Sequence, residues 1–290
     1  MTWSYRISVM GFGKWIGRRP VLRSAGLAVS LVAPGGPPAP PPANNPPIRF
    51  LSIYPAPSKN PAAPFVGVIG DSTGTQLAAP LAAELNPRGV GLVSATVGGC
   101  QPTDTVLTYG SAEYFQRHQN CPQDAREKQN DMVFRFRPRV VIWADIMERF
   151  DIKVNNRIVV AGSEEWKWLM LESWNRTLDR LGRADVVLIL PTWWAGWPRN
   201  SPASFPVEQQ RALFRSWAEL HPGRVTVVDL GPVICPAGPP CEQVVNGVQL
   251  RTDHVHYTPE GTRRAIAKIM TDAAILRNIR GPVAGPASVK

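Results

Sequence analysis

The chain has 290 residues, 44% of them hydrophobic, which is enough to bury one sizeable core in one or two domains. Its formal net charge of +10 would suit a nucleic-acid-binding protein, but seven of the 32 basic residues and none of the 22 acidic residues precede Asp71. Because the rest of the chain is nearly balanced in charge, we exclude nucleic acid as a partner.

The first 33 residues have the order of a targeting segment. Five basic residues precede an apolar stretch at 25–33, as in a signal peptide, but this stretch is too short to span a bilayer. We interpret residues 1–33 as either a targeting segment or a truncated membrane segment. Eight prolines lie within residues 34–47, and we expect a proline-rich linker over 34–64.

From residue 65 onward, short apolar runs alternate with segments of helical periodicity. Strands are expected near 65–69, 90–96, 139–144, 185–190 and 224–229. Helices are expected near 73–86, 123–134, 164–181, 206–220 and 259–278. Five such βα units predict a flavodoxin-like three-layer α/β/α domain over 65–280 with a five-stranded parallel sheet, followed by a disordered tail at 281–290. Ligands are expected at the carboxyl ends of the strands.

The sequence Gly-Asp-Ser at 70–72 lies where the first expected strand turns into the first helix. Free backbone amides and the helix dipole stabilise an alkoxide or oxyanion at such a place, so Ser72 is the candidate nucleophile. The alternative is that Ser72 or Thr73 only caps the helix.

Near the other end of the chain, the sequence TDHVHY at 252–257 contains an Asp-x-x-His pair. A serine needs a base to remove its proton, and an imidazole needs a carboxylate to fix its tautomer. We therefore expect Asp253 and His256 to complete a triad with Ser72. His254 is a neighbouring candidate, and Asp253 could instead be a turn residue before the last helix.

These two motifs together resemble the SGNH, or GDS-type, hydrolase superfamily over about residues 65–279. The chain is most similar to the extracytoplasmic SGNH domain fused to type-3 membrane acyltransferases of actinobacteria. The segment CPAGPPCEQVVNGVQLRTDHVHYTPEG at 235–261 carries this narrower resemblance, since a small cysteine loop leads through a short strand pair into Asp-x-x-His.

The resemblance implies a serine-dependent O-acyl esterase or acyltransferase of the SGNH hydrolase fold, acting outside the cytoplasm on an acylated cell-envelope glycan or a small ester. It implies no cofactor and no metal, and it implies a membrane acyltransferase as the partner that supplies the acyl group. Two other functions stay open: a catalytically silent glycan-binding module, and a lipase or thioesterase acting at the membrane surface.

An oxyanion hole needs converging donors, and the candidates are the backbone amides of Ser72 and of Gly99, or of its neighbour Gly98, because glycine lets the backbone approach a substrate. Superfamily members have a further Asn donor after the third strand, where this chain has Asp145. An ionised Asp145 cannot donate, so we interpret it as an acceptor for a substrate hydroxyl or as a capping residue.

Further candidates for substrate binding are Asp71, Trp193 and Trp194. The two tryptophans follow the fourth expected strand, where aromatic rings can stack on sugar faces. Their alternative role is a hydrophobic lid over the sheet edge.

Four cysteines form two sequence-local pairs without the spacing of a zinc site. We expect the disulfides Cys100–Cys121 and Cys235–Cys241, which would indicate an extracytoplasmic location. Buried free thiols are the alternative.

Overall fold

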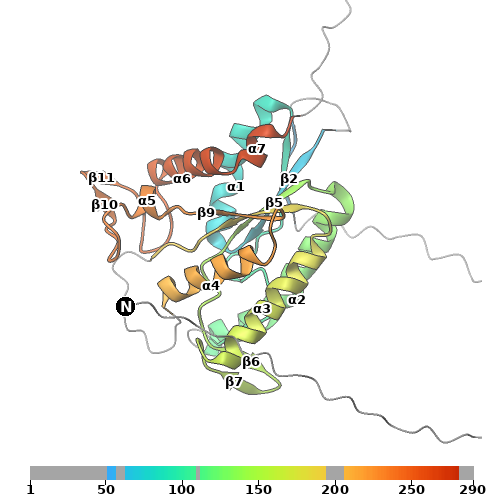
Figure 1. The fold of residues 1–290 in the computed structure, drawn as a ribbon, viewed down its shortest axis with the longest axis vertical. Coiled ribbons are helices and arrows are strands. Elements are labelled where there is room, and N and C mark those ends of the chain that lie inside the picture. The colour runs from blue at the N-terminus through green and yellow to red at the C-terminus, as the bar shows by residue number, and fades with distance from the viewer. Residues whose placement is uncertain (1–50, 57–62, 109–111, 194–205, 281–290) are drawn as a thin grey trace, which may run out of the picture. The chain divides into compact units, whose positions relative to one another are not determined.

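The computed structural model describes residues 51–56, 63–108, 112–193 and 206–280, without the side chains of 112–118. The expected targeting segment, most of the linker, the C-terminal tail and Trp194 lie outside the described residues. The described residues form three layers, with a central sheet between two layers of helices (Figure 1).

The central sheet of the described part has the strand order β1-β3-β2-β5-β8-β9. Five of these strands are parallel to one another, as predicted. They are β2 (Phe65–Gly70), β3 (Gly91–Ser94), β5 (Val140–Ala144), β8 (Asp185–Ile189) and β9 (Val225–Val228).

A sixth strand, β1 (Ser52–Tyr54), pairs antiparallel with β3 at the edge of the sheet. It lies in the segment that the proline content predicts to be linker, so the expected domain start at residue 65 is too late. Proline-flanked segments can still pair at a sheet edge, because an edge strand needs hydrogen bonds on one side only.

Helices cover both faces of the sheet (Figure 1). On one face lie α1 (Ser72–Leu85), α5 (Gly231–Ile234), α6 (Pro259–Asp272) and α7 (Ala274–Asn278), and on the other α2 (Ala112–Phe136), α3 (Glu164–Arg180) and α4 (Val207–Glu219). A short 3₁₀ helix, η2 (Asn86–Arg88), follows α1. No described helix combines the length and the hydrophobicity needed to cross a bilayer.

The apolar strands are explained by burial on both faces. In β5, Val140 and Ile142 belong to the core under α1 and α6, whereas Val141 and Trp143 belong to the core under α2, α3 and α4. Such strands read as continuous apolar runs without alternation. This two-sided burial holds the sheet, and hence its carboxyl edge, in place.

Two smaller sheets accompany the central one in the described part. One contains β4 (Val106–Leu107), β6 (Ile152–Val154) and β7 (Arg157–Val159). The other is the hairpin of β10 (Val244–Val245) and β11 (Val248–Gln249), which is the strand pair expected between the cysteine loop and Asp253.

Candidate active site

Asp71 caps the helix that begins at Ser72. Its Oδ1 accepts hydrogen bonds from the Thr73 amide at 2.7 Å and the Thr73 hydroxyl at 2.6 Å, and its Oδ2 accepts from the Ile146 amide at 3.1 Å. Asp71 is buried and accepts all three of these bonds, and its expected role in substrate binding stays a prediction. Because Asp71 takes the capping role, the hydroxyl of Ser72 is left for another partner.

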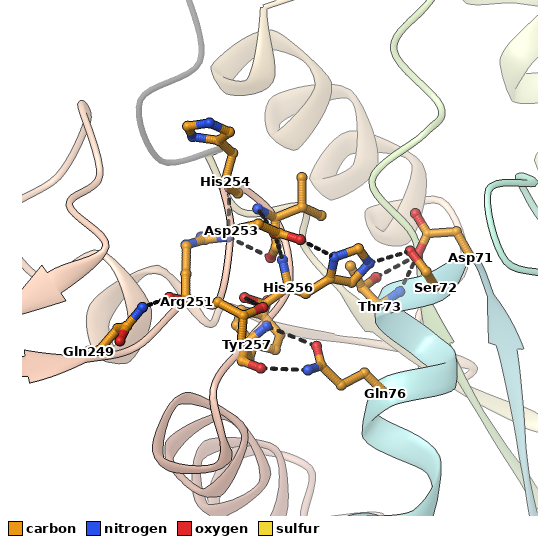
Figure 2. A network of polar contacts seen from close by, with 12 residues as sticks. Asp71, Ser72, Thr73, Gln76, Gln249, Arg251, Asp253, His254, His256 and Tyr257 are labelled. Atoms are coloured by element: carbon orange, nitrogen blue, oxygen red, sulfur yellow. Dashed lines mark hydrogen bonds and ion pairs between the residues drawn. The ribbon is translucent and has the colours of Figure 1, made fainter.

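That partner is His256, whose Nε2 lies 2.8 Å from Ser72 Oγ (Figure 2). On the other side of the ring, Nδ1 lies 2.8 Å from Asp253 Oδ2. The second carboxylate oxygen, Oδ1, accepts from the amides of Val255 and His256, both at 2.7 Å. The structure thus brings together Ser72, His256 and Asp253 from opposite ends of the chain.

The ionisation of Asp253 suits this arrangement. Partial burial acts to raise its pKa, but the hydrogen bonds from the His256 ring and from two backbone amides outweigh it and lower the pKa to about 2. An ionised Asp253 accepts a hydrogen bond from Nδ1–H, so the ring proton stays on Nδ1 and Nε2 is left as the acceptor for the Ser72 hydroxyl proton. In this tautomer His256 can act as a general base.

His254, the neighbouring candidate, is placed differently. Its ring points away from Ser72 (Figure 2), while its carbonyl lies 3.5 Å from the Arg251 guanidinium. Of the two histidines, His256 therefore has the geometry of a base toward Ser72.

Gly99 lies in the loop after β3, in a left-handed conformation with φ of 74°. The loop is held on both sides: the Val97 amide donates to Gly70 O at 3.0 Å, and Cys100 is disulfide-bonded to Cys121 of α2. This anchoring keeps the loop beside the strand that leads to Ser72. The amides of Ser72 and Gly99 stay our candidates for the oxyanion hole.

Asp145 follows β5 directly and is buried with Asp71 and Glu148. Its Oδ2 accepts from the Met147 amide at 3.1 Å and the Glu148 amide at 3.0 Å, which favours the capping interpretation over a substrate-hydroxyl acceptor. Burial, with further contributions from the charges of Asp71 and Glu148, raises the pKa of Asp145 well above its usual range. This raised pKa favours the protonated form of Asp145, in contrast to the ionised residue assumed from the sequence.

Trp193 is tied into the domain on several sides. Its indole nitrogen donates to Glu208 at 2.6 Å, the Arg211 guanidinium lies 4.4 Å from its ring centroid, and the ring packs on the Cys235–Cys241 disulfide. With one face covered by Arg211, these contacts favour a lid role for Trp193 over sugar stacking.

Both expected disulfides are present, Cys100–Cys121 and Cys235–Cys241. The alternative of free thiols is therefore wrong. Within the described ranges, no group of three or more His, Cys, Asp or Glu side chains is arranged to hold a metal ion.

Two residues that sequence reasoning missed contact the loop of Asp253 and His256. Gln76 bonds to the backbone of Tyr257, and Arg251 lies buried inside the loop (Figure 2). The sequence could have identified Gln76 in one way: Gln76 follows Ser72 by four residues and therefore lies on the same face of the helix. Nothing in the sequence marks Arg251.

A family model described as "SGNH domain (fused to AT3 domains)" matches residues 44–271. No curated protein matches the sequence significantly.

Two solved structures share the fold. The periplasmic domain of a lipopolysaccharide acetyltransferase from Salmonella ser. Paratyphi A is 14% identical with a TM-score of 0.50, over 73% of this chain and 84% of that one. A lipase/acylhydrolase from Enterococcus faecalis is 14% identical with a TM-score of 0.50, over 76% of this chain and 100% of the other. At this identity the likeness shows the fold alone.

Proposed function

Since the chain belongs to the family of SGNH domains that are fused to AT3 domains, we propose that it forms an acyl-serine intermediate at Ser72. Membership places it among the enzymes that hydrolyse carboxylic esters or transfer O-acyl groups. The observation that carries the proposal is the hydrogen-bonded relay from Ser72 through His256 to Asp253. A silent glycan-binding module would not need this relay.

In the first half-reaction, Ser72 Oγ attacks the carbonyl carbon of an ester while His256 Nε2 takes the hydroxyl proton. Asp253 stabilises the resulting imidazolium. The amides of Ser72 and Gly99 donate to the oxyanion of the tetrahedral intermediate. As the intermediate collapses, the C–O bond to the alcohol breaks, His256 returns its proton to that alcohol, and the acyl group stays on Ser72.

In the second half-reaction, His256 removes a proton from water or from a sugar hydroxyl, and the oxygen attacks the acyl-serine. The bond to Ser72 Oγ then breaks, and Oγ recovers its proton from His256. Water gives net hydrolysis, and a sugar hydroxyl gives acyl transfer.

An open site supports a polymeric acceptor. The side chain of His256 is 38% exposed and Ser72 is partly exposed, so the reacting end of the relay is reachable from solvent. We propose an acylated cell-envelope glycan as the substrate, with a membrane acyltransferase supplying the acyl group. The two disulfides support an extracytoplasmic location, where such bonds persist.

The test is Ser72→Ala, assayed on p-nitrophenyl acetate and on acetylated xylan. We expect kcat to fall by about 10³-fold or more, because the nucleophile is lost while the helix cap, which belongs to Asp71, stays. His256→Ala should lose about as much, since members of a triad act as a unit. Labelling by a fluorophosphonate should disappear in Ser72→Ala.

His254→Ala is the matched control, and we expect it to keep kcat within about twofold. Near wild-type hydrolysis by a folded Ser72→Ala protein would refute the mechanism. A wild-type protein that binds glycans but neither hydrolyses esters nor reacts with the fluorophosphonate would support the silent module instead. Preference for long-chain esters over acetyl esters would favour the lipase alternative.

A further inference from the structure

The loop that carries Asp253 and His256 is braced from inside by Arg251. The guanidinium is buried, and its Nη1 donates to Val255 O at 2.8 Å. Its Nη2 donates to Trp193 O at 2.8 Å and Thr192 Oγ1 at 3.1 Å, both in the segment after β8. With the two backbone amides that bond to Asp253, these contacts give the loop a defined internal shape.

The same loop is attached to the nucleophile helix through Gln76. The Gln76 side chain donates from Nε2 to Tyr257 O at 2.5 Å, and its Oε1 accepts from the Tyr257 amide at 2.9 Å (Figure 2). One amide thus satisfies both backbone polar groups of the residue that directly follows His256. Gln76 itself lies one helical turn beyond Ser72.

This arrangement links two positions that must meet for proton transfer. The Gln76–Tyr257 contact joins the loop to α1. Without this contact the loop can move relative to the helix, which alters the distance between His256 Nε2 and Ser72 Oγ. Proton abstraction requires that distance to stay within hydrogen-bond reach, and a misplacement of about 1 Å can cost about 10²-fold in rate.

We infer that Gln76 is a positioning residue, which holds the loop of His256 in register with the helix of Ser72. The inference rests on the proposed acyl-serine mechanism for its effect on rate. Gln76 touches neither substrate nor reacting atoms in this role; it acts through the backbone of Tyr257.

The experiment compares Gln76→Met with Gln210→Met in the full chain. Gln210 of α4 is a buried glutamine whose Nε2 donates to Glu148 O at 2.7 Å, so its replacement removes a similar bond away from the loop. For Gln76→Met we expect kcat on p-nitrophenyl acetate to fall about tenfold or more with KM within about twofold. Fluorophosphonate labelling of Ser72 should slow in parallel, and hydrogen exchange of the Tyr257 amide should quicken.

For Gln210→Met we expect a lower thermal midpoint with kcat and Tyr257 exchange unchanged. A folded Gln76→Met protein with kcat within about twofold of wild type would overturn the inference, as would equal kcat losses in both variants. If the wild type hydrolyses no ester, the proposed function fails, while Tyr257 exchange still tests the contact.

If the Gln76→Met protein does not fold, the Gln76→Glu variant tests the same inference. A carboxylate keeps the acceptor for the Tyr257 amide but loses the donor to Tyr257 O, and protonation restores that donor. We therefore expect the ratio of variant to wild-type kcat to rise as the pH is lowered. A ratio near one at every pH would overturn the inference.

Discussion

Single residues at this site differ in charge state because they differ in exposure. Asp253 is half exposed and accepts three hydrogen bonds, so its pKa lies at about 2 and it is an anion at every working pH. Asp145 and Glu148 are buried, and burial penalises their charged forms and raises their pKa values. The charged form is thus favoured at Asp253, beside the imidazole ring, and disfavoured at the two buried carboxyl groups.

The buried Glu148 predicts a pH-dependent stability. Burial is the main cause that raises its pKa from 4.5 to about 8, so the folded state holds its proton more tightly than the unfolded chain does. Between about pH 4.5 and pH 8 the unfolded state releases this proton while the folded state keeps it, and the stability of the fold decreases as the pH rises. The effect is on the order of a few kcal/mol at pH 8.

Glu148→Gln should reduce this dependence, because glutamine is neutral at all pH values and can still accept from the Trp174 indole, which lies 3.1 Å from Glu148 Oε2. The pH dependence is measured as the difference between the free energies of unfolding in urea at pH 5 and at pH 8, for the variant and the wild type. An equal decrease in the free energy of unfolding from pH 5 to pH 8 in the variant and the wild type would contradict the prediction.

Among the elements, the turn from β2 into α1 depends on a glycine. Gly70 has a φ of 139°, and a Cβ built there would lie 1.7 Å from Ala144 O on the neighbouring strand β5. Backbone atoms of a central strand cannot move away at small cost. We expect Gly70→Ala to destabilise the protein by about 4 kcal/mol or more, or to prevent folding.

Gly98→Ala is the control for this change, since a Cβ at Gly98 meets nothing within 4 Å. Its thermal midpoint should stay within a few degrees of wild type. A Gly70→Ala protein that melts with the wild type would show that the turn is not constrained as described.

Two helices differ in their bounds from the ranges expected from the sequence. The helix expected over 123–134 begins at Ala112, because Pro122 is accommodated inside α2 and does not start it. The helix expected over 259–278 is interrupted at Ala273, where the backbone leaves the helical region with ψ of 79°. The hairpin of β6 and β7 had a usable signal in Asn155-Asn156, both of which adopt the positive φ of a two-residue turn.

For the whole molecule, the position of β1 predicts where the chain can be shortened. Leu51 is buried, and Ile53 and Tyr54 pack on opposite core clusters while β1 pairs with β3. A protein starting at residue 48 should keep its esterase activity and thermal midpoint. One starting at residue 65 should lose about 2–4 kcal/mol and expose the β3 edge, which favours aggregation.

Thermal melting and light scattering of the two truncated proteins test this. Equal midpoints would mean that β1 adds nothing to the fold. Loss of the fold in the longer protein would mean that residues 1–47 are part of the domain.

Local patterns in the sequence determined the five βα units and both disulfides. They also identified the residues of the relay, whose geometry the structure then supplied. Apolar runs and helical periodicity are local properties, the cysteines pair with near neighbours, and the chemistry of a serine nucleophile restricts which residue types can serve it.

Only the tertiary structure decided which charged and polar residues are buried and what they contact. Asp71 and Asp145 are both buried where β2 and β5 end as neighbours in the sheet, with Gly70 opposite Ala144, and this brings the Ile146 amide to Asp71. Gln76 meets Tyr257 across 181 residues of sequence. Strand order and long-range docking depend on the packing of the entire core, so no segment read by itself contains them.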